Sequence, residues 1–126
     1  MTNNEKELLL KDLSARLPDK VKVKSSRRTT VTVLTTDIIN DFYLGCDVKP
    51  YLRPLSSMTK EERDELKEMC ADYLDELENA KTVVDKWKLD AKTSYLKSAF
   101  YNSHHLDWNG LIEKGLALKA PENMYK

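Results

Sequence analysis

Glycine, cysteine and histidine are scarce in this sequence, and each scarcity argues against a class of chemistry. Three glycines in 126 residues leave few places for a phosphate-binding loop or a nucleophile elbow, and the sequence contains neither motif. The two cysteines, Cys46 and Cys70, lack CxxC spacing, so we expect buried, inert thiols instead of a disulfide. The two histidines, His104 and His105, are adjacent, and adjacent side chains rarely ligate one metal. We therefore expect no metal site and no cofactor.

A long apolar run and a net charge are also absent. No apolar stretch approaches the ~20 residues that span a bilayer, and the first residues do not resemble a signal peptide, so we expect a cytoplasmic protein without membrane contact. The 21 basic and 21 acidic residues cancel, which removes any bulk attraction for nucleic acid. The charge is nevertheless segregated, because residues 59–90 carry eleven acidic and six basic side chains, or −5, between two mildly basic parts.

The sequence begins with the pattern of a capped helix. Asn4 and Glu7 have the spacing of a capping box, with Asn4 as the N-cap. Leucines at helical spacing follow, and Pro18 ends the run. We therefore predict an N-terminal helix that covers one face of a sheet.

Two segments after this helix alternate apolar and polar residues. Residues 21–24 and 29–36 have the alternation and the β-favouring composition of strands, and residues 25–28 would join them as a hairpin. Residues 38–44 are flanked by turn-forming residues, so we expect either a third strand or an irregular return. Next, Pro50 and Pro54 each remove a backbone donor, which predicts that residues 48–58 form a packed, extended crossover.

The most amphipathic helix is predicted to start after Thr59, which forms a second capping box with Glu62. Its acidic positions are expected in solvent: Glu61, Glu65, Glu68 and Asp72. Its apolar stripe is expected in the core: Leu66, Met69, Cys70, Tyr73, Leu74 and Leu77. Whether this helix continues or breaks near Asn79 stays open, and Asp90 could cap a further helix that ends near Asn102.

The last thirty residues have dense helix punctuation. Asp107 is positioned to cap a short helix that Gly115 ends, and residues 116–120 would then form a closing strand or an extended tether. The apolar side chains of this tail must pack on the domain or dock on a partner: Trp108, Leu111, Ile112, Leu116 and Leu118.

These elements predict one α+β domain over residues 1–126. Residues 1–47 form the helix and hairpin part, residues 48–58 the proline-rich crossover, and residues 59–126 the helical part with an ordered tail. A small antiparallel sheet of about three strands would pack between the N-terminal helix and the helical C-terminal half.

Three groups of polar residues are candidates for function. A basic run could contact nucleic-acid phosphates or an acidic protein, although such a face also keeps an edge strand unpaired: Lys20, Lys22, Lys24, Arg27 and Arg28. Asp107 beside His104 and His105 could support acid–base chemistry, but a helix cap explains the aspartate equally well. The carboxylates of residues 64–76 could suggest a metal site, yet a solvated helix face is the usual cause of such a pattern.

Parts of the sequence resemble a known family. The stretch Lys49–Thr59 with the acidic helix after it is similar to a segment of small uncharacterised proteins encoded by phages and prophages of gut Bacteroidales. The stretch His104–Tyr125 resembles the ending of that family, and Leu9–Pro18 resembles its opening, so the likeness covers about half of the chain. The chain departs from the family between about Asn79 and Tyr101, where it lacks the usual length and the aromatic-Leu-Asn entry to the paired histidines.

The resemblance implies a setting, a mobile element inside a bacterial host cell, and transfers no catalytic residue. We therefore predict a non-enzymatic accessory protein that binds a macromolecular partner, such as a host protein or a host-defence complex. The alternative is a nucleic-acid-binding module that uses the basic hairpin.

Overall fold

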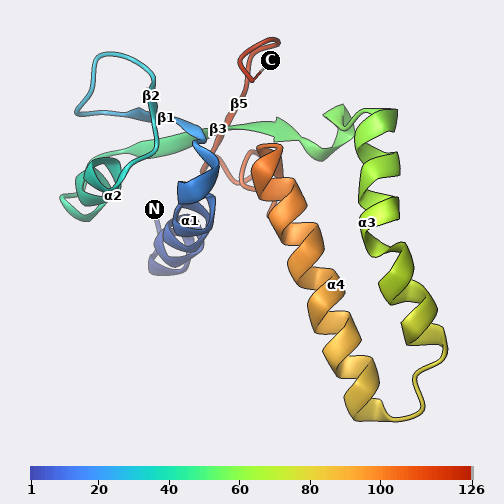
Figure 1. The fold of residues 1–126 in the computed structure, drawn as a ribbon. Helices are drawn as coiled ribbons and strands as arrows, with labels where there is room; N and C mark the ends of the chain where they lie inside the picture. The colour runs from blue at the N-terminus through green and yellow to red at the C-terminus, as the bar shows by residue number, and fades with distance from the viewer. Residues whose placement is uncertain (126) are drawn as a thin grey trace.

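A computed structural model describes residues 1–125, except for the side chains of Asp72, Leu74 and Leu77. Figure 1 shows a small sheet with the first two helices below it and a long two-helix hairpin that projects away from the sheet. This arrangement confirms the α+β class. None of the helices in the described residues has the length and apolarity needed to cross a bilayer.

The sheet is mixed, whereas the sequence predicted an antiparallel one. Its strands are β1 (Lys22–Ser25), β2 (Thr32–Val33), β3 (Val48–Pro54), β4 (Leu106–Asp107) and β5 (Leu118–Lys119). Strand order is β2-β1-β3-β4, and β5 also pairs with β3. The β1–β2 and β1–β3 pairs are antiparallel, while β4 and β5 run parallel to β3. The two C-terminal strands therefore complete a sheet that the N-terminal half begins.

The segment predicted as a crossover is the central strand of this sheet. Residues Val48–Pro54 are extended, as the prolines required, but they also pair with three other strands. Pro50 lies opposite Val23 and is buried in the middle of β3. The prediction failed because proline is usually excluded from central strands. Other residues of β3 still donate to the neighbouring segments, as Arg53 N does to His105 O at 2.7 Å, and they hold the strand in the sheet.

The first helix, α1 (Asn3–Arg16), starts two residues earlier than predicted. Thr2, and not Asn4, is its N-cap, because the Thr2 hydroxyl accepts from Glu5 N at 3.1 Å and Glu5 Oε1 accepts from Thr2 N at 3.0 Å. The capping box is therefore present, shifted to an earlier pair with the same spacing. A short 3-10 turn, η1 (Leu17–Asp19), contains Pro18 and ends the helix as predicted.

The largest secondary-structure error falls on residues 29–44. Strand β2 covers only Thr32–Val33, and the region predicted as a third strand or irregular return is the helix α2 (Thr36–Tyr43). Ile38 is 2% exposed and faces the core, so burial of this side chain holds the short helix α2 against the sheet. The threonines and aspartates around it had suggested strand and turn, because their local propensities favour both.

The two long helices are α3 (Lys60–Glu78), preceded by the turn η2 (Leu55–Ser57), and α4 (Val83–Ser103). The Thr59–Glu62 capping box is confirmed, with Glu62 N donating to Thr59 Oγ1 at 3.2 Å. The helix breaks after Glu78, and Thr82 caps α4, so the expectation that Asp90 starts a helix was wrong.

The apolar stripe of α3 is only partly buried. Cys70 is 4% exposed and Leu66 and Tyr73 are half-buried, but Met69, predicted to be buried, is 36% exposed. The expected burial of Leu74 and Leu77, and the expected exposure of Asp72, fall on side chains outside the described set. Glu61, Glu65 and Glu68 lie in solvent as predicted.

The core lies between α1, α2 and the lower face of the sheet. Among the described side chains, its buried apolar residues come from outside the α3–α4 hairpin: Leu9, Leu13, Val21, Val23, Leu34, Ile38, Val48, Leu52, Leu111, Leu116 and Ala117. An ion pair is buried beside it, in which Arg16 Nε donates to Asp12 Oδ2 at 2.8 Å. Arg16 Nη2 also donates to Leu106 O, which links α1 to β4, and Asn109 donates to the second oxygen of Asp12.

The C-terminal tail packs against this core. Leu111 and Leu116 are 0% and 3% exposed, Ile112 packs against the same core, and Leu118 lies in β5, so the tail contains a closing strand. The prediction of a helix over residues 107–115 was wrong, because this segment forms turns. Asp107 nevertheless acts as a cap, accepting from Leu111 N at 2.8 Å and Ile112 N at 3.0 Å, and Gly115 has the positive φ of 73° expected at such a stop.

Candidate functional site

Helix α4 has two apolar faces, and only one of them is covered. Leu89 and Leu96 are half-buried and Phe100 is 3% exposed, on the face that packs beside α3 (Figure 1). The opposite face carries apolar residues at intervals of three and four, which places them on one line along the helix. We name this line the outer stripe of α4, and its members are Val84, Trp87, Ala91 and Tyr95.

The outer stripe is exposed to an extent that is unusual for large apolar side chains. Tyr95 is 72%, Trp87 67% and Val84 54% exposed, and Val83 beside them is 61% exposed. Single exposed apolar residues are common, but a contiguous line of them on one helix marks an interaction surface. Tryptophan and tyrosine are also the residues that contribute most to binding energy at protein interfaces.

The sequence contains a signal for this surface. Val84, Trp87, Ala91 and Tyr95 follow one another at intervals of three and four residues. The apolar residues of α4 in fact follow two stripes on opposite faces, so they cancel in any search for a single amphipathic face. In the described chain, α3 packs along one face of α4, while the residues of the outer stripe stay exposed.

A polar cluster joins the base of the hairpin to the sheet. Arg53 on β3 binds the Glu62 carboxylate through both terminal nitrogens, at 2.9 and 2.7 Å. His104, at the end of α4, approaches the same carboxylate with Nδ1 2.9 Å from Glu62 Oε2. The cluster opens on a cavity of about 840 Å³, whose other wall is formed by residues 119–125. The hairpin is therefore fixed to the body by charged hydrogen bonds at its base.

Glu62 is the centre of this cluster and is saturated with donors. The double hydrogen bond from Arg53 is the main reason that the pKa of Glu62 falls from 4.5 to about 2, and the Thr59 backbone N–H adds to the effect. A carboxylate behind a histidine can orient a general base. However, within the described residues no hydrogen bond links the other ring nitrogen of His104 to a serine, threonine or cysteine. The geometry therefore fits a structural joint.

The cluster predicts a pH-dependent stability. Because the folded pKa of Glu62 lies below its ordinary value, its contribution is fully present above pH 4.5 and is lost as pH falls toward 2. We expect Glu62→Gln to be less stable than the wild type at neutral pH, and the difference to shrink as the pH is lowered through this window. Urea unfolding of both proteins from neutral pH to about pH 2 measures this. A difference independent of pH would contradict the role of the Glu62 charge.

The structure does not bring His104, His105 and Asp107 together as an acid–base group. His104 pairs with Glu62, and Asp107 caps backbone N–H groups. His105 has a positive φ of 59° and stacks on Tyr125 with ring centroids 3.9 Å apart. Burial lowers the pKa of His105 to about 4, and the nearby charge of Arg16 acts in the same direction. The three side chains thus have separate contacts, and Nδ1 of His105 is buried without a hydrogen-bond partner among the described residues.

The basic run divides into groups with different surroundings. Arg27 and Arg28 lie in the loop between β1 and β2, and both approach Asp41, with nitrogen–oxygen distances of 3.6 and 3.1 Å. Hydrogen bonding to Arg28 is the main reason that the pKa of Asp41 is lowered. Lys20 lies before β1 with a φ of 57°, and Lys22 donates to Met124 O at 3.0 Å. Lys24 points into solvent from β1.

The other candidates from the sequence are placed as follows. Trp108 donates from its ring nitrogen to Asn102 Oδ1 at 2.9 Å and remains 37% exposed. Cys46 is half-buried, Cys70 is buried, and both thiols are free. In the described part of the chain, no three histidine, cysteine, aspartate or glutamate side chains gather into a potential metal site.

Comparison with known proteins returned no relative. No family model matches the chain, and no curated protein and no solved structure matches it either.

Proposed function

We propose that this protein acts by binding a protein partner through the outer stripe of α4, and not by catalysis. The observation that carries the proposal is the contiguous exposure of Val84, Trp87 and Tyr95 on a helix that projects from the body. Burying such side chains provides about 25 cal/mol per Å² of apolar surface, so a matching apolar groove on a partner would gain several kcal/mol from this stripe.

The construction of the hairpin supports a binding role. The cluster of Arg53, Glu62 and His104 fixes the base of the hairpin, while α3 covers the opposite face of α4. A stripe held on a supported helix loses little conformational freedom when it binds, which favours affinity. His104 and Asp107 are held by separate hydrogen bonds and His105 by stacking on Tyr125, which is consistent with binding.

The resemblance stated for the sequence suggests where the partner would be found. A protein of a phage or prophage acts inside a bacterial host cell, so we propose a host protein, for example a component of a defence complex, as the partner.

The proposal predicts a selective loss of binding. We expect the tagged protein to capture a partner from a lysate of the host, and Trp87→Gln with Tyr95→Gln to reduce capture at least tenfold, because both anchors are lost. Glutamine is a good helix former, so α4 should persist and the melting temperature should not fall. Affinity capture with quantitative mass spectrometry provides the measurement.

The matched control removes two equally exposed apolar side chains elsewhere. Tyr43 and Leu44, at the end of α2, are 69% and 63% exposed. Tyr43→Gln with Leu44→Gln is expected to leave capture unchanged. If the α4 variant captures the partner as well as the wild type does, or if the control loses it, the outer stripe is not the binding surface.

A further inference from the structure

In residues 1–125, one face of the sheet has no helix on it. Helices α1 and α2 pack against the lower face, where Val21, Val23 and Leu52 are buried (Figure 1). Side chains alternate along a strand, so the residues between these buried positions point to the opposite side. We name this side the open sheet face, and its members on the three N-terminal strands are Lys22, Lys24, Val33, Lys49 and Tyr51.

Two lysines lie directly opposite each other on the open sheet face. Lys24 of β1 and Lys49 of β3 are cross-strand partners in the antiparallel register. Like charges at such positions repel and destabilise a sheet. Neither lysine belongs to an ion pair in the described residues, and Asp47, two residues before Lys49, forms none with them. An anion between the two ammonium groups would convert this repulsion into binding.

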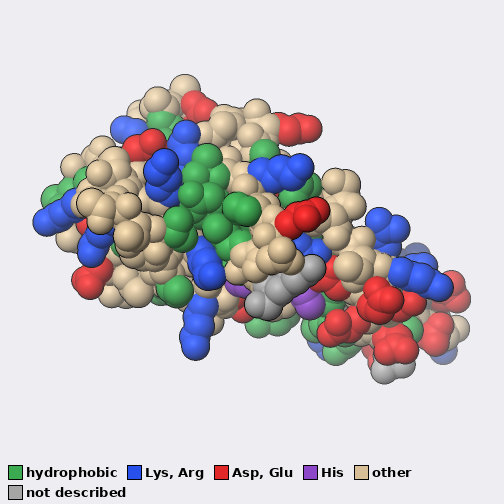
Figure 2. Space-filling model, turned by 90° about the horizontal axis from the view of Figure 1, so that it is seen from above, with side chains coloured by type: hydrophobic (Ala, Val, Ile, Leu, Met, Phe, Trp, Pro, Cys, Tyr) green, Lys and Arg blue, Asp and Glu red, His purple; other side chains and the backbone are tan. Residues whose placement is uncertain are grey.

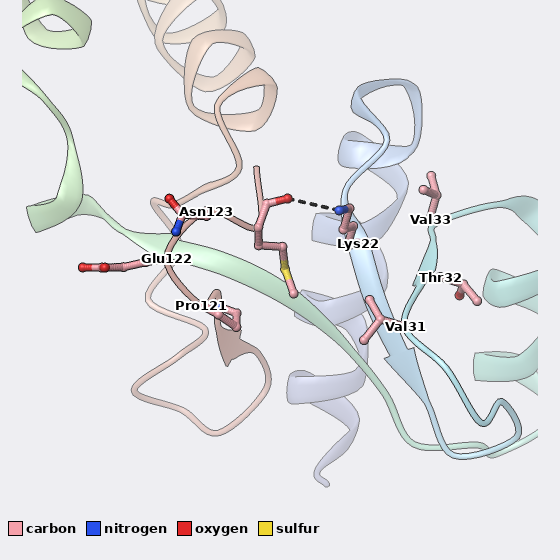
Figure 3. Close-up of a pocket in the computed structure, with 8 residues that line it drawn as sticks. Lys22, Val31, Thr32, Val33, Pro121, Glu122 and Asn123 are labelled. Carbon is pink, nitrogen blue, oxygen red and sulfur yellow. Dashed lines mark hydrogen bonds between the residues drawn. The ribbon is translucent and has the colours of Figure 1, made fainter. Parts of the chain in front are cut away.

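Apolar surface lies beside the lysines. Figure 2, which looks down on the molecule, shows hydrophobic side chains gathered in the middle of this view with basic side chains around them. Val31 and Val33 are 44% and 41% exposed. They line a cavity of about 450 Å³ with Lys22, whose opposite wall is the tail segment 121–124 (Figure 3). This volume lies in the range of about 300–1,000 Å³ that is usual for ligand sites.

We propose that the open sheet face binds single-stranded nucleic acid. The phosphate backbone would contact Lys24 and Lys49, while unstacked bases would pack on the apolar surface of Val31, Val33 and Tyr51. This combination of backbone cations with apolar or aromatic platforms is how open sheets bind single strands. The site differs from the loop between β1 and β2, where Arg27 and Arg28 already share the carboxylate of Asp41.

The apolar surface selects the single strand over other polyanions. A duplex keeps the faces of its bases stacked inside, so it would use the lysines and leave the valines and Tyr51 uncovered. An acidic peptide would likewise satisfy only the charges. A single strand uses both features of the face. This site is independent of the outer stripe of α4, so either proposal can fail without the other.

The test measures binding of fluorescein-labelled single strands of about 15 nucleotides by anisotropy, at salt concentrations from about 50 to about 200 mM. We expect Lys24→Gln with Lys49→Gln to weaken binding roughly tenfold and to reduce the salt slope by about 1.4, since each phosphate contact to a single strand contributes about 0.7. The control, Lys6→Gln with Lys11→Gln, removes the same charge from exposed positions on α1 and should bind as the wild type does.

A second readout needs no ligand. The Lys24→Gln, Lys49→Gln variant should melt at a higher temperature than the wild type at low salt, with the difference shrinking at about 1 M salt, because screening removes the repulsion. The proposal is overturned if the wild type does not bind a single strand, or if the control loses binding equally. Tighter binding of a duplex or of polyglutamate would also overturn it, because either result would mean that the apolar surface is not used.

Discussion

Replacing Asp12 with alanine is expected to reduce the free energy of unfolding by about 3–5 kcal/mol, a large share of the stability of a small domain. The side chains of Arg16 and Asp12 are 0% and 1% exposed, so the variant leaves a guanidinium in the interior without its counter-ion. Arg16 would keep only its bond to Leu106 O, and its Nη1 atom already lacks a hydrogen-bond partner among the described residues. Urea unfolding at neutral pH gives the value.

The matched variant removes both charges. Asp12→Leu with Arg16→Met fills a similar volume with apolar atoms, so no unpaired charge remains, and the double variant should be more stable than Asp12→Ala alone. If the double variant is the less stable of the two, the bond from Arg16 to β4 contributes more than the pairing of charges, and the explanation is wrong.

Removing residues 116–126 is expected to unfold the protein. The deletion takes away Leu116 and Ala117, which are 3% and 5% exposed, and strand β5 with them. One buried leucine alone is worth about 2–5 kcal/mol, and the lost strand pairing adds to this, so the total approaches the 5–15 kcal/mol that holds a domain folded. Circular dichroism should show a large loss of melting temperature or an aggregated product.

A milder change at the same place provides the control. Tyr125 accepts a hydrogen bond from Lys22 N at 3.0 Å and donates one to Tyr51 O at 2.6 Å. Tyr125→Phe loses only these bonds and should cost about 1–3 kcal/mol without unfolding the protein. If the truncated chain stays folded, or if the amides of residues 116–120 exchange at once in the intact protein, the tail is a docking peptide and not part of the core.

The sequence predicted the features that depend on local pattern. The α+β class and the cap at Thr59 could be predicted, because capping pairs and alternation act over a few residues. For residues 116–120 the sequence left a closing strand and an extended tether open, and the structure forms the strand at Leu118–Lys119. The alternation predicted for residues 21–24 is present in the structure, where Val21 and Val23 are buried and Lys24 is exposed. Local rules also explain the small error at Thr2, since two capping pairs lay two residues apart and the structure uses the earlier one.

The features that depend on distant contacts were not readable. Pro50 sits in a central strand because β1, β4 and β5 surround that strand, and none of these contacts has a signature near residue 50. His104 pairs with Glu62, which lies 42 residues earlier in the sequence, whereas the sequence suggested a group with the adjacent His105 and Asp107. The exposure of Trp87 could be known only once α3 was seen to cover the other face of α4.

The position of the hairpin between β3 and β4 has a consequence for how this protein can diversify. Because β3 and β4 are adjacent in the sheet, the hairpin leaves the body and returns to it at neighbouring points. The length and sequence of the α3–α4 hairpin can therefore change without disturbing the core. Changes to the exposed face of α4 are therefore expected to leave the sheet and the core of the body intact.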